Sequence, residues 1–169
     1  MISPDYIRTL AAYNRWQNAS LYTAASTLSD AKRKQERGAF FGSLHATLSH
    51  IMWGDQIWLS RFGGFPAPDV RGFAGSTDLH PLWDDLAAAR GALDDTIDAW
   101  AADVDADWLG GELTWVSAAL KREFTQPLWK LVTHMFNHQT HHRGQVHAML
   151  TAAGAQPDDT DIPFMPPTS

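Results

Sequence analysis

Apolar residues recur at spacings of three and four along most of this chain, which is the repeat of a helix with one buried face. The pattern predicts four long helices, at residues 4–28, 41–62, 81–102 and 127–153. Four amphipathic helices with two long connections and no internal repeat are typical of a four-helix bundle with crossover loops. We therefore predict an all-α fold.

Glycine and proline mark several helix ends. Pro4 suits a first helical turn, and glycines follow the second and fourth predicted helices at Gly63 and Gly154. The polar stretch 29–38 is expected to be a loop or a frayed helix end. Residues 63–80 are rich in Gly, Pro and Asp, and we expect a long loop there.

The second predicted helix is apolar on most sides, which indicates burial against several neighbours. Between Trp108 and Gln126 the helical period is lost, and two short β-tolerant runs flank residues 118–121. We predict a small β-hairpin there, just before the last helix. Residues 155–169 include four prolines and are expected to lie extended over the surface.

Length and composition narrow the class of protein. The 169 residues suit one domain, spanning 1–169, and 44% hydrophobic residues can fill its core. A formal net charge of -6 argues against nucleic acid as a partner, and no stretch of 18 apolar residues predicts a membrane span. Cysteine is absent and the N-terminus does not resemble a signal peptide, so we expect a cytoplasmic protein without disulfides or thiolate metal sites.

Histidine is the residue type that points to chemistry. The chain has eight, and five of them lie between residues 134 and 147. His138 and His142 fall on the apolar seam of the last predicted helix, so both should face the interior. Their spacing of four places both imidazoles on one face, one turn apart, where they can share one metal ion.

A third ligand should come from another buried helix, and His50 is the best candidate. Gly54 and Ile57 lie within about 40° of its direction around the second predicted helix, so His50 points along an inward line. Gly54 would leave room there for an ion or a substrate. The alternative is that all three are hydrogen-bonded core histidines, but each buried imidazole without a partner costs about 1–3 kcal/mol. One metal ion would satisfy three at once, so we favour a metal site at His50, His138 and His142.

Three imidazoles that leave coordination positions open are typical of catalytic rather than structural zinc sites. Imidazole also suits nickel, copper and iron. Such a metal can lower the pKa of a bound water or hold a thiolate. His134 and His141 flank the seam and are candidates for outer ligands or supporting groups. Asn137 and Gln145 are candidates for orienting ligand imidazoles, and the alternative for both is that they cap neighbouring loops. We assign no role to three histidines expected on partly exposed faces: His45, His80 and His147.

Other catalytic motifs are absent from the sequence. Gln139 stands where a zinc protease helix would carry its glutamate base, so H-E-x-x-H is not present. Asp103, Asp105 and Asp107 imitate the start of a calcium loop, but Trp108 occupies the position that requires glycine. The chain also has neither a phosphate-binding loop nor a G-x-S-x-G elbow.

Four segments together resemble the DinB/YfiT-like family. The most specific is N-H-Q-T-H-H-R-G-Q at 137–145, and it is accompanied by Y-N-R-W-Q-N at 13–18, L-S-H-I at 48–51 with Asp55, and D-I-P-F at 161–164. The resemblance covers nearly the whole chain. It implies an up-down-down-up four-helix bundle, usually a homodimer, with zinc or nickel held by three histidines. Carried over by position, these are the same three that the seam geometry selects.

The resemblance also implies chemistry with small thiols, because relatives with assigned activities include thiol-cofactor transferases and a mycothiol-dependent isomerase. Arg143 follows a predicted ligand and is a candidate for binding the carboxylate of a small-molecule substrate or cofactor. The alternative is a structural ion pair with an acid such as Asp55. The name of the family refers to DNA damage, but the acidic charge here argues against DNA binding.

Three functions stay open at this point. The first is a metal-dependent enzyme that transfers or activates a low-molecular-weight thiol or hydrolyses a small substrate. The second is a non-catalytic metal-binding stress-response protein, and the third is a dimeric interaction module. The open coordination positions favour the first, but no side chain is identified as a catalytic residue.

Overall fold

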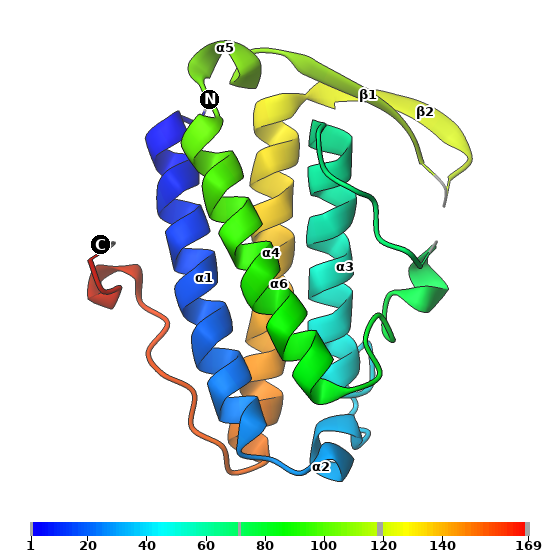
Figure 1. Ribbon diagram of the computed structural model, residues 1–169, viewed down its shortest axis with the longest axis vertical. Helices are drawn as coiled ribbons and strands as arrows, with labels where there is room; N and C mark the ends of the chain where they lie inside the picture. The colour runs from blue at the N-terminus through cyan, green and yellow to red at the C-terminus, as the bar shows by residue number, and fades with distance from the viewer. Residues whose placement is uncertain (1, 71, 118–119, 168–169) are drawn as a thin grey trace.

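The computed structural model describes residues 2–70, 72–117 and 120–167. This part of the chain is mostly helical, with a small antiparallel sheet of two strands (Figure 1). In chain order the elements are α1 (Pro4–Ser26), α2 (Asp30–Lys34), α3 (Leu44–Phe62), the 3-10 helix η1 (Phe73–Gly75), α4 (Trp83–Asp103), α5 (Ala106–Leu109), β1 (Glu112–Ser117), β2 (Arg122–Pro127), α6 (Leu128–Ala152) and the 3-10 helix η2 (Ile162–Phe164).

The four long helices occupy the four predicted segments. The ends of α1, α4 and α6 differ from the prediction by one or two residues. α3 begins at Leu44 rather than at residue 41, because Gly42 adopts a φ of 77° that a helix cannot contain. Ser43 then caps the helix by accepting a hydrogen bond from the backbone N–H of Ala46 at 3.2 Å.

Two short helices were not predicted. α2 lies in the polar stretch 29–38, where Ser29 accepts from the backbone N–H of Lys32. α5 follows α4 directly, and Asp105 caps it by accepting from the N–H of Trp108 at 2.8 Å. Both are too short to show an apolar repeat, so only their caps distinguish them from loops.

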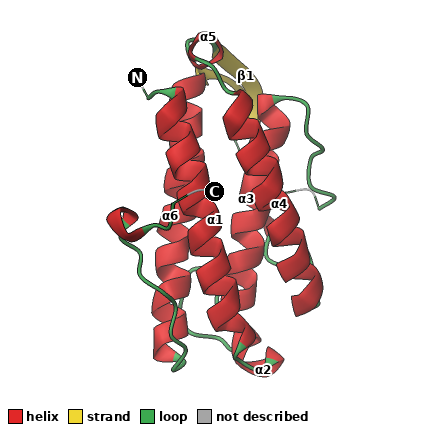
Figure 2. Cartoon of the chain, turned by 60° about the vertical axis from the view of Figure 1, so that its left-hand side comes forward, coloured by secondary structure: helices red, strands yellow, loops and turns green. Residues whose placement is uncertain are grey.

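Each long helix lies beside its neighbours along most of its length (Figure 2). α1 packs against α4 and α6, and α3 packs against the same two helices. α1 and α6 run from the top to the bottom of Figure 1, whereas α3 and α4 run in the opposite direction. The core takes apolar side chains from all four and from α5, the largest fully buried ones being Ile7, Leu21, Leu44, Leu48, Ile51, Met52, Leu59, Leu86, Ile97, Leu109, Met135 and Leu150.

A charged network interrupts the apolar core. The buried carboxylate of Asp55 on α3 accepts hydrogen bonds from Arg90 of α4 and from Gln139 of α6, each at 2.7 Å. Arg90 also donates to Asp94 at 2.8 Å. Buried charges are tolerated when they are paired in this way, and these pairs fix the positions of α3, α4 and α6 relative to one another.

The predicted hairpin is present and lies at the upper ends of α3 and α6 in Figure 1. Trp115 and Phe124 are paired across the two antiparallel strands, and their rings stack at 5.6 Å between centroids. Trp115 also contacts Trp58 of α3, which holds the hairpin against the helices. Ala118 and Ala119, in the expected turn, lie outside the described residues.

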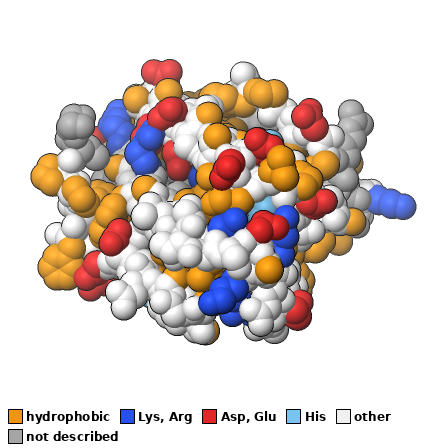
Figure 3. Space-filling view, turned by 60° about the horizontal axis from the view of Figure 1, so that its bottom comes forward, with side chains coloured by type: hydrophobic (Ala, Val, Ile, Leu, Met, Phe, Trp, Pro, Cys, Tyr) orange, Lys and Arg blue, Asp and Glu red, His pale blue; other side chains and the backbone are white. Residues whose placement is uncertain are grey.

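The segment that follows α6 returns along α1 (Figure 2). Gln17 donates to the carbonyl oxygen of Asp159 at 2.9 Å, and the Tyr13 hydroxyl donates to that of Thr160 at 2.8 Å. Acidic, basic and hydrophobic side chains are interspersed on the lower face of the molecule, with small areas of histidine between them (Figure 3). Within the described ranges, we find no helix with the length and apolar character needed to cross a membrane.

Candidate metal centre

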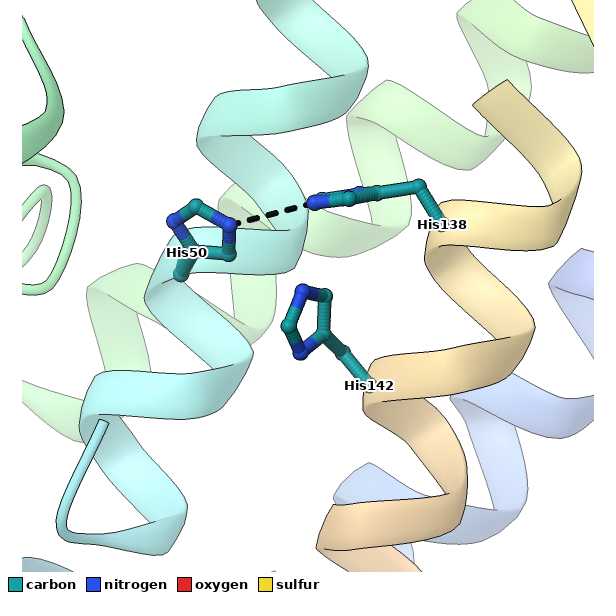
Figure 4. Close-up of side chains that lie close together, drawn as sticks. All are labelled: His50, His138 and His142. Atoms are coloured by element: carbon teal, nitrogen blue, oxygen red, sulfur yellow. Dashed lines mark hydrogen bonds between the residues drawn. The ribbon is translucent and has the colours of Figure 1, made fainter. Parts of the chain in front are cut away.

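Three histidines from two helices converge at the contact between α3 and α6. α3 supplies His50, and α6 supplies His138 and His142 (Figure 4). One ring nitrogen of each lies within 4.8 Å of those of the other two, and the Nε2 atoms of His50 and His138 are 3.1 Å apart. The structure therefore brings together the three residues that the sequence selected.

Gly54 shapes the site in a way that differs from the expectation. It lies one turn after His50, on the face of α3 turned toward α6. A Cβ atom at this position would lie 2.8 Å from Cε1 of His138, well inside van der Waals contact. The missing side chain leaves room for the imidazole of His138 rather than for an ion or a substrate.

The geometry fits a small divalent cation. Zinc–imidazole bonds of about 2.0–2.1 Å place two nitrogen ligands roughly 3.3 Å apart in a tetrahedral site and about 2.9 Å apart in an octahedral one. The separation of 3.1 Å between His50 and His138 lies between these values. Only small side-chain movements would bring His142 to the same ion, since its ring centroid is 4.5 Å from that of His138.

A hydrogen bond from outside the triad fixes the tautomer of His50. The hydroxyl of Ser76, which is fully buried, donates to the carbonyl oxygen of Phe73 at 2.7 Å. Ser76 must then accept from Nδ1–H of His50, which lies 2.9 Å away. Nε2 of His50 is left with its lone pair directed at the centre of the triad.

His142 has a similar partner on its own helix. Its Nδ1 lies 2.9 Å from the side-chain oxygen of Gln145, which can only accept, so Nδ1 is the donor. The amide nitrogen of Gln145 faces the ring of His141 at 3.4 Å. Gln145 thus holds the Nε2 lone pair of His142 toward the centre of the triad. Asn137, the other residue expected to orient a ligand, has an exposed side chain.

Burial keeps the triad neutral at ordinary pH. Desolvation, with a smaller contribution from His142, lowers the pKa of His50 to about 4. Desolvation and the neighbouring imidazoles together lower the pKa of His138 to about 3. The pKa of His142 is lowered by burial as well. Neutral imidazoles are the form that coordinates metal, so the site needs no proton loss near pH 7.

Aromatic rings surround His50. Phe41 stacks on it with centroids 4.0 Å apart and also lies 5.3 Å from His142. Phe73 meets the same ring edge-on at 5.4 Å, and Trp53 lies at 5.7 Å. These side chains come from α3 and from the two segments that flank it, and they restrict the access of water to the triad.

The other histidines lie outside this cluster. His134 is exposed and contacts Trp58 at 5.1 Å, and His141 is exposed beside His142. His45, expected on a partly exposed face, is instead buried, with Nε2 at 2.8 Å from the carbonyl oxygen of His80. The prediction for His45 was wrong because Leu44 and Leu48 draw its side of α3 into the core.

Arg143 points toward α1 and away from the triad. It is buried, donates to the side-chain oxygen of Asn14 and to Thr140, and lies over the ring of Tyr13. Asp55, its suggested ion-pair partner, is paired with Arg90 instead. Arg143 lines a cavity of about 280 Å³ together with Tyr13, Gln17, Leu21, Thr140, Gly144, His147 and Thr160.

Ser76 and the phenyl rings were not anticipated as parts of the site. Ser76 and Phe73 lie in the long segment between α3 and α4, where no repeat relates a residue to a face. The apolar pattern predicts Phe41 inside a helix that begins only after it. The sole signal in the sequence is that an aromatic pair, Phe40 and Phe41, precedes the helix that carries His50.

Comparison with known proteins identifies relatives of similar sequence and fold. The chain is 26% identical over 172 residues to Protein DinB of Bacillus subtilis (strain 168), with 93% of this chain and 91% of that protein covered. It also superposes on the crystal structure of a DinB-like protein from Bacillus cereus ATCC 10987 with a TM-score of 0.60. That match has 20% identity and covers 85% of this chain and 90% of the other. The model of the DinB family matches residues 1–168, and the chain therefore belongs to the DinB family.

Proposed function

We propose that the protein binds one divalent metal ion, zinc or nickel, through His50, His138 and His142 and uses it to act on a small-molecule substrate. The observation that carries the proposal is the buried triad, whose ligand nitrogens lie within 4.8 Å of one another. Two hydrogen bonds that aim Nε2 atoms at a common point support it, because such bonds are typical of metal-bound histidines.

Bound zinc or nickel would supply an open coordination position, where it can lower the pKa of a water or a thiol. The protein's own side chains would orient the ligands and exclude water. Ser76 and Gln145 hold two of the imidazoles in the ligating tautomer. Phe41 and Phe73 exclude water around His50, which strengthens charge interactions in the site.

Two reaction classes suit this arrangement: transfer or activation of a low-molecular-weight thiol, and hydrolysis of a small substrate. The buried carboxylate of Asp55 is engaged by Arg90 and Gln139, so it is not free to act as an acid or a base. Thiol chemistry needs less proton transfer from the protein than hydrolysis does, so we favour it.

Elemental analysis of the purified protein, followed by cobalt substitution, tests the proposal. One equivalent of metal is expected, together with a visible cobalt spectrum that changes when a thiol is added. His138→Ala should abolish the spectrum, whereas His147→Ala, a half-buried histidine of the same helix, should preserve it. The site would be refuted if the wild-type protein bound no metal, or if the His138→Ala variant bound metal as tightly as the wild type. Metal binding without turnover of any thiol or ester would instead favour the non-catalytic role.

Further proposals accompany this function. We propose that the long helices form the up-down-down-up four-helix bundle of the family. We also propose that the protein is a homodimer, and sedimentation analysis can test this oligomeric state. For Arg143 we propose anion binding in its own cavity rather than at the triad, because its guanidinium faces α1.

A further inference from the structure

Three phenyl rings from two separate segments gather at the surface beside the triad. Phe40 and Phe41 precede α3, and Phe73 begins η1. The centroids of Phe40 and Phe41 are 4.9 Å apart, those of Phe41 and Phe73 are 5.6 Å apart, and those of Phe40 and Phe73 are 6.3 Å apart. We call Phe40, Phe41 and Phe73 the aromatic lip.

The aromatic lip is continuous with the candidate metal ligands. Phe41 contacts both His50 and His142, and Phe73 contacts His50. The inner ring, Phe41, is half-buried, whereas Phe40 is 74% exposed and Phe73 is 55% exposed. The rings thus extend from the triad to solvent.

Packing alone does not account for the outer two rings. A phenyl ring contributes to stability in proportion to the surface that it removes from water, and Phe40 removes little. The rings also lack a cationic partner, since the arginines that lie over aromatic rings in the described residues cover Trp83, Trp58, Trp115, Phe124 and Tyr13 instead. A lip of this kind suits an uncharged apolar group.

We infer that the aromatic lip binds an aromatic or branched aliphatic group of the ligand, attached one or two bonds from the donor atom that coordinates the metal. The inference rests on the proposed function. It narrows the substrate class to small thiols with an apolar substituent. A substituent that extends from the triad past Phe41 toward solvent would contact Phe73 and Phe40. Burying one more phenyl ring should strengthen binding about tenfold or more.

The test compares two thiols of similar acidity, 2-mercaptoethanol and phenylmethanethiol, on the cobalt-loaded full-length protein. Spectral titration gives a Kd for each. The wild type should bind phenylmethanethiol at least tenfold more tightly, and the double variant Phe40→Ala/Phe73→Ala should reduce this preference at least fivefold. The preference is a ratio of two Kd values measured on the same fully cobalt-loaded protein, so it does not depend on the cobalt affinity of the variant. Phe164→Ala is the matched control, because Phe164 is 66% exposed and lies in η2, on the segment that follows α6. This control should keep the wild-type preference.

Both outer rings are exposed, so the double variant should fold, and its cobalt spectrum verifies this. Equal affinity of the wild type for the two thiols would overturn the inference but not the metal site. The inference would also be overturned if the double variant kept the wild-type preference for phenylmethanethiol. If cobalt did not bind at the triad, the proposed function would fail, and the inference would fail with it.

Discussion

Replacing Gly54 with alanine isolates the packing that positions His138. In the middle of an unobstructed helix, alanine is more favourable than glycine by about 1 kcal/mol, so the change alone should stabilise α3. Here the new methyl group would lie 2.8 Å from Cε1 and 3.2 Å from Nδ1 of His138. The backbone need not move, because a side chain is the neighbour that must yield.

The size of the effect follows from these distances. Carbon atoms in contact prefer about 3.5–4.0 Å, so the imidazole must shift by roughly 0.7 Å or more. Metal–ligand distances tolerate only about 0.2 Å. We expect Gly54→Ala to weaken metal binding about 10- to 100-fold, the range seen when groups that orient metal ligands are lost. The metal-free protein should keep its stability.

Competition with a coloured chelator measures the affinity, and thermal unfolding of the metal-free protein measures the stability. Gly91→Ala is the matched control, because Gly91 lies in α4 and a Cβ atom added there would have no neighbour within 4 Å. It should raise stability and leave metal binding unchanged. If Gly54→Ala bound metal as tightly as the wild type, the imidazole of His138 would not be a ligand in the described position.

Three further predictions follow from named contacts. Ser76→Ala removes the acceptor of His50 Nδ1–H and should weaken metal binding about tenfold in the same chelator assay, and an unchanged affinity would contradict the assigned tautomer. The pKa of His50 is about 4 in the native protein against about 6.5 when unfolded, so the unfolded chain binds the extra proton first. The metal-free protein should therefore lose on the order of 2 kcal/mol of unfolding free energy between pH 7 and pH 4.5, and His50→Phe should lose less in urea titrations at the two pH values. Asp94→Leu leaves Arg90 with one carboxylate fewer and should cost about 3–5 kcal/mol in the same titrations, and a cost under ~1 kcal/mol would mean that the buried network contributes little.

The helices and the pair of histidines on α6 were predictable from sequence because both depend on short spacings within one helix. His138 and His142 are four residues apart, and that interval fixes their relative position before any tertiary contact forms. His50 could be added because Gly54 and Ile57 lie within about 40° of its direction around the helix, which indicated that its side chain faces inward.

The supporting groups could not be predicted, because they depend on how loops fold over the long helices. Ser76 reaches His50 only through the path of residues 63–82, and Phe41 does so only because a turn at Gly42 ends before α3 begins. Arg143 and Asp55 are both buried, so the sequence alone allows an ion pair between them. The packing of α4 brings Arg90 to Asp55 instead.

The most direct test is a crystal structure of the protein grown with zinc, with anomalous scattering recorded at the zinc edge. We predict a single strong peak about 2.0–2.1 Å from the Nε2 atoms of His50, His138 and His142. A peak bound by other residues, or a crystal grown in excess zinc that shows no peak at the triad, would contradict it.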